Sequence, residues 1–346
     1  MSDPVTRRGF IKTAGFSGAA AAALAGEAVA AETGPTNKEP QVKQKMDLSK
    51  EKIRIGTLVN GSVQGGPANY IRQILPHGFE SFSITFWQTL GGADLAKMAG
   101  EIKEVLGDSG VVISSLGIFG NPLKDDDMAR QTRDGWAKLI DAAHRFGCNI
   151  VTGFAGRVVD KPVPESLPRF KEVFTPLAKQ AADKGVKLAF ENCEMGGDWH
   201  RGDWNIAHNP VAWEMMFNTI PMDNLGLQWE PAHQLCALTD PMPQLRKWVK
   251  KIFHLHGKDA TVLWDVVREY GIGGCRPFVW HRHPGFGDSN WTDIISELRR
   301  GGFVGAIDIE GWHDPVYRDE LEMTGQVAAL NYLKRCRGGS FVPNPT

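Results

Sequence analysis

The chain has no excess of charge of either sign. Lysine plus arginine total 39 and aspartate plus glutamate total 40, which gives a formal net charge of −1. A protein that holds nucleic acid through a general basic field needs a clear surplus of cations. The sequence also lacks any apolar run of about 18 residues, the length that a membrane-spanning helix needs. From these two absences we expect that the protein has no nucleic-acid partner and no stable membrane anchor.

Cysteine is sparse and irregularly spaced. The five thiols lie at Cys148, Cys193, Cys236, Cys275 and Cys336, and no two of them form a C-x-x-C pair. This pattern argues against a disulfide framework and against a thiolate zinc site. Nucleotide-binding motifs are lacking as well, since no G-x-G-x-x-G follows the first predicted strand and no G-x-x-x-x-G-K-[ST] occurs.

The first 31 residues differ in composition from the rest. Residues 6–12 (TRRGFIK) precede an Ala/Gly-rich, weakly apolar stretch, and residues 28–30 (AVA) supply small side chains. A basic start, a short apolar region and an A-x-A end predict a signal peptide over 1–31. The paired arginines resemble the twin-arginine export signal, which implies a periplasmic or extracellular location. The polar segment 32–52 is predicted to be a flexible linker.

After residue 52, short apolar runs rich in β-branched residues alternate with longer amphipathic stretches, a pattern typical of a parallel sheet. Eight strands are predicted at 53–59, 79–85, 111–116, 149–154, 186–191, 225–229, 252–256 and 305–310. Helices are predicted at 67–75, 93–106, 126–146, 165–184, 210–218, 241–249, 291–300 and 318–335. Eight such units predict an α/β fold, a single (β/α)8 TIM barrel over 53–337 with a tail at 338–346. A doubly wound sheet is the alternative.

Side chains that can bind metals follow the last four predicted strands. They are Glu191, Glu230, His256 and Glu310. Because barrel active sites lie at the carboxyl ends of the strands, these groups should converge. A shared cation would relieve the cost of burying the acids. Three carboxylates and one imidazole suit one divalent metal ion, with Mn²⁺ favoured and Mg²⁺, Co²⁺ or Zn²⁺ as alternatives. His254 is expected to be a barrel-interior histidine.

Tryptophan is abundant, with eleven residues against four tyrosines. Seven tryptophans fall at or beyond predicted strand ends: Trp87, Trp199, Trp204, Trp229, Trp264, Trp280 and Trp312. Because sugar C–H faces stack on aromatic rings, they predict a sugar-binding rim, with core packing as the alternative for each. The long loop 194–208 adds His200 and Arg201 as candidate substrate contacts. Arg282 is a further candidate substrate contact, with an ordinary surface position as its alternative.

The strand-end motifs together resemble a known family. They are Phe190-Glu191-Asn192, Glu230 followed by His233, His256-x-Lys258-Asp259 and Ile309-Glu310-Gly311, with Pro284-Gly285-x-Gly287 ahead of Trp291. In this order they are similar to the xylose-isomerase-like barrels. More narrowly, residues 52–337 resemble the sugar phosphate isomerase/epimerase group of the ketose 3-epimerase type. One departure is Glu230, where the family usually has aspartate; the longer side chain should still reach a metal.

The resemblance implies a divalent-metal-dependent sugar isomerase or epimerase. Glu191 and Glu310 would lie on opposite faces of the substrate. One would remove and the other return the proton beside a carbonyl, through a metal-bound enediolate. His233 and Lys258 would bind substrate oxygens, although a Lys258–Asp259 salt bridge fits the sequence equally well. On the same barrel, a metal-dependent lyase or hydratase could instead eliminate the aglycone from a 3-keto-glycoside.

Two further classes stay open. An exported sugar-binding barrel would bind without turnover, and the presence of both acid/base glutamates counts against it. An endonuclease-IV-like phosphodiesterase would need a histidine-rich multi-zinc cluster and a DNA-binding surface, which the histidine placement and the net charge do not support. The predicted partner is therefore a small-molecule sugar or glycoside, and the sequence leaves a homo-oligomer open.

Overall fold

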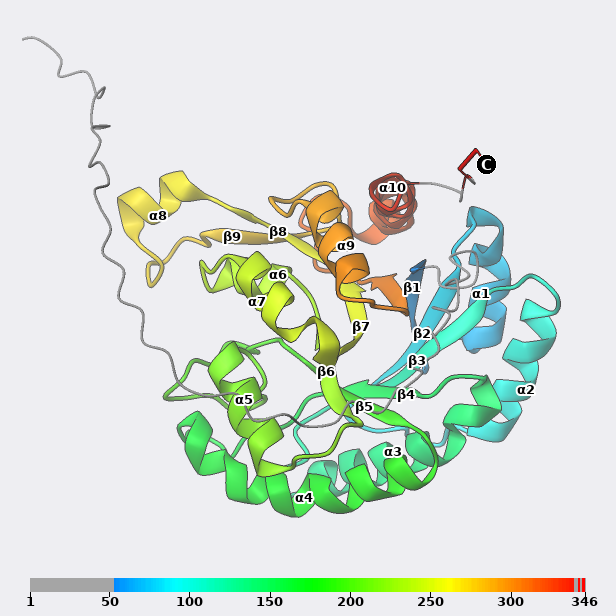
Figure 1. Ribbon diagram of the computed structural model, residues 1–346, viewed down its shortest axis with the longest axis horizontal. Coiled ribbons are helices and arrows are strands. Elements are labelled where there is room, and N and C mark those ends of the chain that lie inside the picture. Colours follow the sequence, from blue (N-terminus) through cyan, green and yellow to red (C-terminus); the bar gives the residue numbers. More distant parts are fainter. Residues whose placement is uncertain (1–52, 339–341, 343, 346) are drawn as a thin grey trace, which may run out of the picture. The chain divides into compact units, whose positions relative to one another are not determined.

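The computed structural model describes residues 53–338, 342, 344 and 345. The predicted signal peptide and linker, and most of the predicted tail, lie outside the described residues. Eight parallel strands close into a barrel in the order β1-β10-β7-β6-β5-β4-β3-β2 (Figure 1). They are β1 (Arg54–Asn60), β2 (Ser81–Trp87), β3 (Val112–Phe119), β4 (Ile150–Gly153), β5 (Lys187–Glu191), β6 (Leu225–Trp229), β7 (Ile252–Gly257) and β10 (Ala306–Ile309). The predicted single TIM barrel is confirmed.

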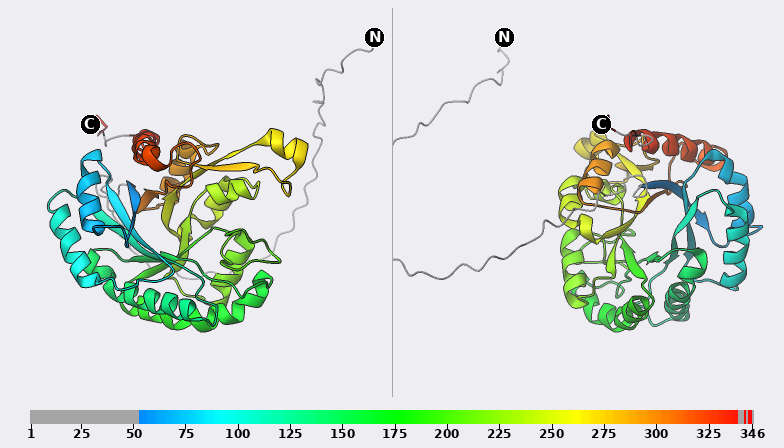
Figure 2. Two further views of the ribbon diagram at one scale, coloured as in Figure 1. Left: turned by 180° about the vertical axis from the view of Figure 1, so that it is seen from behind. Right: turned by 45° about the vertical axis from the view of Figure 1, so that its right-hand side comes forward.

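Helices pack around the outside of these strands (Figure 2). They are α1 (Pro67–Ile74), α2 (Leu95–Leu106), α3 (Asp127–Ala142), α4 (Val163–Asp183), α5 (Pro210–Thr219), α7 (Pro241–Trp248), α9 (Trp291–Arg300) and α10 (Glu322–Cys336). Asp94, Asp126 and Asn209 cap three of the N-termini by accepting backbone N–H bonds. None of the helices among the described residues is long and apolar enough to cross a bilayer.

The last helix begins later than its sequence pattern predicts. Arg318 has an extended backbone, and a short 3-10 turn at Asp319–Leu321 precedes α10. Trp229 also departs from its expected place at the rim, because its side chain is fully buried in the main hydrophobic core. For Trp229 the core-packing alternative is therefore correct.

Four short elements beyond the eight units were not predicted. α6 (Ala232–Cys236) follows β6, while β8 (Asp259–Val262), α8 (Trp264–Tyr270) and β9 (Val279–Arg282) follow β7. β8 and β9 pair antiparallel in a separate two-stranded sheet, which Figure 1 shows beside α8. The helices α6 and α8 are too short for a helical period to show, and all four elements lie outside the strand–helix alternation that predicted the eight units. α6 packs against this sheet.

A buried polar network fills the barrel interior below the carboxyl ends of the strands. His254 lies there, as expected, with Nε2 2.7 Å from Asp308 Oδ2 and Nδ1 2.9 Å from Gln228 Nε2. Asp308 also accepts hydrogen bonds from the hydroxyls of Ser81 and Ser114. His254 and Asp308 are fully buried, so their polar atoms depend on partners within this network.

We expect Asp308→Ala to lower the free energy of unfolding by about 3–5 kcal/mol, because it removes the carboxylate partner of the buried His254 Nε2 and of the Ser81 and Ser114 hydroxyls. Denaturant unfolding followed by circular dichroism measures this change. Asp223→Ala is the matched control, since Asp223 is exposed on a loop and its loss should change stability by less than about 0.5 kcal/mol. Equal stability of the two variants would show that the network contributes little.

Candidate metal and sugar site

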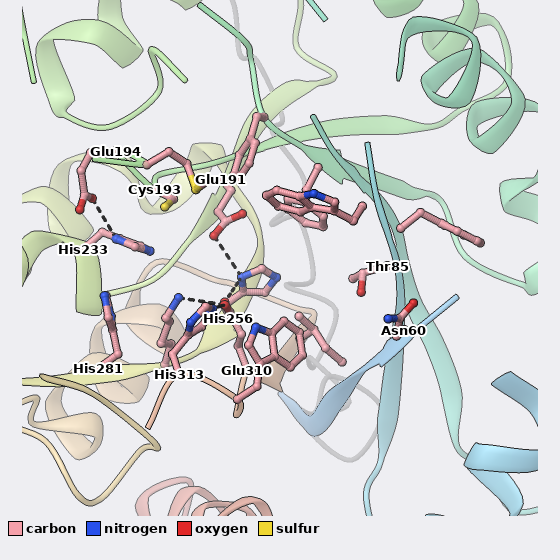
Figure 3. Close-up of a pocket in the computed structure, with 18 of the residues that line it drawn as sticks. Asn60, Thr85, Glu191, Cys193, Glu194, His233, His256, His281, Glu310 and His313 are labelled. Carbon is pink, nitrogen blue, oxygen red and sulfur yellow. Dashed lines mark hydrogen bonds and ion pairs between the residues drawn. The ribbon is translucent and has the colours of Figure 1, made fainter. Parts of the chain in front are cut away.

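The four predicted metal ligands converge at the carboxyl end of the barrel. One ligand atom from each of Glu191, Glu230, His256 and Glu310 lies within 4.8 Å of the others, and all four residues are buried. They come from β5, the end of β6, β7 and the end of β10, which are consecutive around the barrel. Figure 3 shows Glu191, His256 and Glu310 directed toward one another.

The polar atoms of this cluster do not satisfy one another's hydrogen-bonding capacity, but they are suited to binding a cation. His256 Nδ1 lies 3.0 Å from Glu310 Oε2 and 3.6 Å from Glu191 Oε1. Neither nitrogen of His256 has a partner with hydrogen-bond geometry, and neither does Glu310 Oε2 or either carboxylate oxygen of Glu230. Buried polar atoms left in this way are costly. Three carboxylates and an imidazole fit a divalent ion bound among them.

Asn192 holds the ends of β5 and β6 in register. Its side-chain nitrogen donates to the backbone oxygen of Glu230 at 2.9 Å, and its side-chain oxygen accepts from the backbone nitrogen of Glu230 at 2.8 Å. Asn192 thereby fixes the backbone from which Glu230 projects. The sequence motif contained Asn192, but the motif alone indicated no role for it.

Lys258 supplies a positive charge beside the cluster. Its Nζ donates to Glu310 Oε1 at 2.8 Å, and its side chain is buried. Asp259 faces elsewhere and accepts from Trp291 Nε1 at 3.0 Å and from the backbone nitrogen of Ser289 at 3.1 Å. The Lys258–Asp259 salt bridge considered as an alternative is therefore wrong.

The two candidate acid/base glutamates have different electrostatic environments. Burial raises the pKa of Glu191, and the negative charges of Glu310 and Glu230 add to that effect. Burial also acts to raise the pKa of Glu310, but the charge of Lys258 together with the neighbouring imidazoles of His256 and His313 outweighs burial and holds that pKa well below its usual range. Pairs of carboxyl groups held at different pKa values are typical of acid/base sites.

His233 connects the cluster to a further carboxylate. Its Nε2 lies 2.8 Å from Glu230 Oε1, and its Nδ1 lies 2.9 Å from Glu194 Oε2. His233 is buried on α6, while Glu194 is half-buried in the loop after β5 (Figure 3). Glu194 was not among the predicted site residues.

A cavity of about 600 Å³ opens onto these groups. Six of the predicted site residues line it: Glu191, His233, His256, Lys258, Glu310 and Trp312. Sequence reasoning missed other lining residues, which include Asn60, Thr85, Cys193, Glu194, His281 and His313. A signal existed for His313, because it follows Glu310 by three residues; its Nε2 lies 3.0 Å from Glu310 Oε1.

The other predicted substrate contacts lie outside the cavity lining. His200 and Arg201 are exposed, and Trp199 packs against the barrel core. Arg282 is occupied by Asp314, whose Oδ2 lies 3.0 Å from Arg282 Nε. Trp204 does not line the cavity itself, but the centre of its ring lies 5.5 Å from that of the lining residue Trp87. Of these five, Trp204 therefore contacts a lining residue.

Comparisons with known proteins agree with this architecture. A curated relative, the uncharacterized protein YfiH of Bacillus subtilis, is 25% identical over 186 residues, which are 47% of this chain and 56% of YfiH. The chain therefore spans about half the length of that relative.

Three solved structures share the fold. The 3-keto-D-glucoside 4-epimerase YcjR of E. coli is 15% identical, with a TM-score of 0.61 over 82% of this chain and 100% of that one. An L-ribulose 3-epimerase is 16% identical, with a TM-score of 0.61 over 83% and 96%. The probable 3-DHS dehydratase AsbF of Bacillus anthracis is 15% identical, with a TM-score of 0.58 over 81% and 98%.

The family comparison covers most of the barrel. Residues 71–336 match the family described as Xylose isomerase-like TIM barrel. This range includes every predicted metal ligand and all of the barrel strands after β1. The chain therefore belongs to the Xylose isomerase-like TIM barrel family.

Proposed function

We propose that the protein is a divalent-metal-dependent sugar isomerase or epimerase. The observation that carries this proposal is the convergence of three buried carboxylates and one imidazole, largely without hydrogen-bond partners, beside an open cavity that Glu191, His256 and Glu310 line. The sugar epimerases among the structures that share the fold support it. A divalent ion held by Glu191, Glu230, His256 and Glu310 would supply Lewis-acid polarisation of a substrate carbonyl.

The protein's own residues provide for the proton transfers. β6 and β7 separate β5 from β10 in the barrel, so Glu191 and Glu310 approach the cavity from opposite sides of His256. One carboxylate removes the proton from the carbon beside the carbonyl, and the other returns a proton to the opposite face. Lys258 stabilises the negative charge that develops on the substrate oxygen, and His233 binds a neighbouring hydroxyl.

A lyase or hydratase acting on a 3-keto-glycoside is the second candidate. A proton removed beside the 3-keto group leaves electrons that can expel the substituent at C1. The probable dehydratase on the same fold is consistent with eliminations on this barrel. His313 supports the candidate further, because it is 43% exposed with Nε2 3.0 Å from Glu310 Oε1, a position from which it can donate a hydrogen bond to the departing oxygen.

Incubation of the Mn²⁺-loaded protein with ketoses and with 3-keto-glucosides in deuterated water tests both candidates. We expect deuterium at the carbon beside the carbonyl and formation of the epimer, followed by NMR. Release of the aglycone without an epimer would favour the lyase. No exchange with any substrate, despite bound metal, would count against both.

Export by the twin-arginine route belongs to the same proposal. It accounts for the residues 6–12 motif, and it places the reaction where neutral sugars and glycosides are more available than phosphorylated metabolites. Cell fractionation of the full-length chain and of an Arg7→Lys/Arg8→Lys variant tests it. The variant should accumulate in the cytoplasm, whereas equal export of both chains would contradict the proposal.

A further inference from the structure

One wall of the cavity is apolar and has no part in the chemistry proposed above. We call Trp87, Phe119, Phe154 and Met195 the aromatic wall; all four line the cavity. Phe119 and Phe154 belong to a small hydrophobic cluster separate from the barrel core, with Met195 packed against it. These side chains therefore face the cavity instead of completing the main core.

The aromatic wall begins at a metal-ligand candidate and leads outward. The ring of Phe119 lies 6.0 Å from that of His256 and 5.3 Å from that of Phe154, nearly perpendicular to the latter. Phe154 in turn contacts Trp87 edge-on at 6.4 Å. Trp87 is 55% exposed, with Trp204 behind it. A molecule held at His256 would extend along these rings toward solvent.

The backbone is held in an unfavourable conformation at two places along the wall. Met195 has φ 51°, and Gln88, directly after Trp87, has φ 59°. Side chains other than glycine rarely adopt this left-handed region, and such strain clusters at binding sites. Two hydrogen bonds fix Gln88: its nitrogen donates to Phe119 O at 2.9 Å, and its oxygen accepts from Thr132 Oγ1 at 2.6 Å. The orientation of Trp87 is thereby set by the fold.

The composition of this side of the cavity selects the kind of group that it can hold. Asn60 and Thr85 are the polar residues that line the cavity from β1 and β2, away from Glu194, His233 and His281 (Figure 3). A second sugar would bring several hydroxyls, and two side chains cannot replace all of their hydrogen bonds to water. An aryl ring needs no such partners and gains from stacking against edge-on aromatic rings. The wall therefore suits an aryl group better than a sugar.

We propose that the aromatic wall is a subsite for an aromatic aglycone, so that the substrate is an aryl glycoside derivative rather than a free monosaccharide. This inference rests on the proposed function, because the sugar ring must be held at the carboxylates for its substituent to reach the wall. Asn60 and Thr85, which also line the cavity, are the candidates to bind a polar group on the aryl ring.

Calorimetric binding to the Mn²⁺-loaded protein tests the subsite without turnover, because the probes carry no carbonyl. The probes are phenyl β-D-glucopyranoside, methyl β-D-glucopyranoside and methyl β-cellobioside. We expect phenyl glucoside to bind at least about tenfold more tightly than methyl glucoside. Trp87→Ala should remove most of that preference, and since Trp87 is 55% exposed, the change should not affect folding. Tyr270→Ala is the control, an aromatic residue 39% exposed on α8 and outside the cavity lining.

Three other outcomes of this experiment would contradict the proposed aryl subsite. Equal binding of phenyl and methyl glucosides would show that the aryl group makes no contact. Tighter binding of methyl β-cellobioside would assign the wall to a second sugar. In both cases methyl glucoside still binds and the proposed function stands. If methyl glucoside fails to bind and Trp87→Ala does not affect binding of the phenyl glucoside, the subsite and the proposed sugar chemistry fail together.

Discussion

Replacement of Glu191 or of Glu310 by glutamine is expected to lower the rate of formation of the deuterated epimer by about 10²–10⁴-fold. Glutamine has nearly the same shape as glutamate but cannot accept the proton from the carbon beside the carbonyl. Both single variants should be impaired, because proton removal and proton return occur on opposite faces of the substrate. The measurement is NMR of the exchanged position in single-turnover and steady-state conditions.

The matched control is Glu214→Gln. Glu214 is 57% exposed on α5 and lies 3.5 Å from Lys247, so its replacement should leave the rate of epimer formation unchanged. If either site variant still forms the epimer at the wild-type rate, the carboxylate it lacks is not needed on its face of the substrate and the two-base epimerase proposal fails. Exchange within about threefold of the wild type in both variants would remove both glutamates from the chemistry.

Loss of the metal is expected to abolish turnover and to lower thermal stability. Ligands that bind only the folded state stabilise it by about 2.7 kcal/mol at 100 times Kd. Mn²⁺ added to chelator-treated protein should therefore raise Tm by several degrees. His256→Ala should eliminate the Tm response and reduce the bound metal, because the imidazole is the one nitrogen donor in the cluster. Metal content is measured by elemental analysis after dialysis.

His144→Ala provides the control for the metal experiment. His144 is exposed after α3, and its Nε2 lies 2.6 Å from the backbone oxygen of Lys184, far in sequence from every candidate ligand. This variant should bind metal as the wild type does. Unchanged metal content in His256→Ala and in Glu310→Gln would mean that the metal binds elsewhere or that none is required.

Much of the architecture follows from local patterns. The spans predicted for the sixth strand and for the helix at Trp291–Arg300 coincide with β6 and α9, and the other main elements differ by a few residues at their ends. Strand periodicity and glycine or proline at element ends are properties of neighbouring residues. The parallel barrel then places all strand ends on one face, which explains why four residues far apart in the chain could be predicted to meet.

The roles of polar side chains on the rim were less predictable. Arg282 was a plausible substrate contact in the sequence, but it pairs with Asp314, 32 residues further along the chain. Lys258 pairs with Glu310 instead of with its neighbour Asp259. A charged side chain pairs with the oppositely charged group that lies nearest in space with suitable geometry. Several such groups are available along the chain, and the sequence alone does not show which of them is nearest.

The sequence by itself predicted the barrel and the metal-ligand candidates, because each depends on residue types at the ends of regular strands, and its resemblance to a known family implied the candidate acid/base pair. Tertiary structure alone decided which residues share the cavity. The aromatic wall contains Phe119 from β3 and Phe154 after β4, whose residue types are equally suited to core packing. Only the closure of the barrel brings these rings beside His256 and leaves Trp87 exposed, since contacts between separate strands depend on distances that local patterns do not encode.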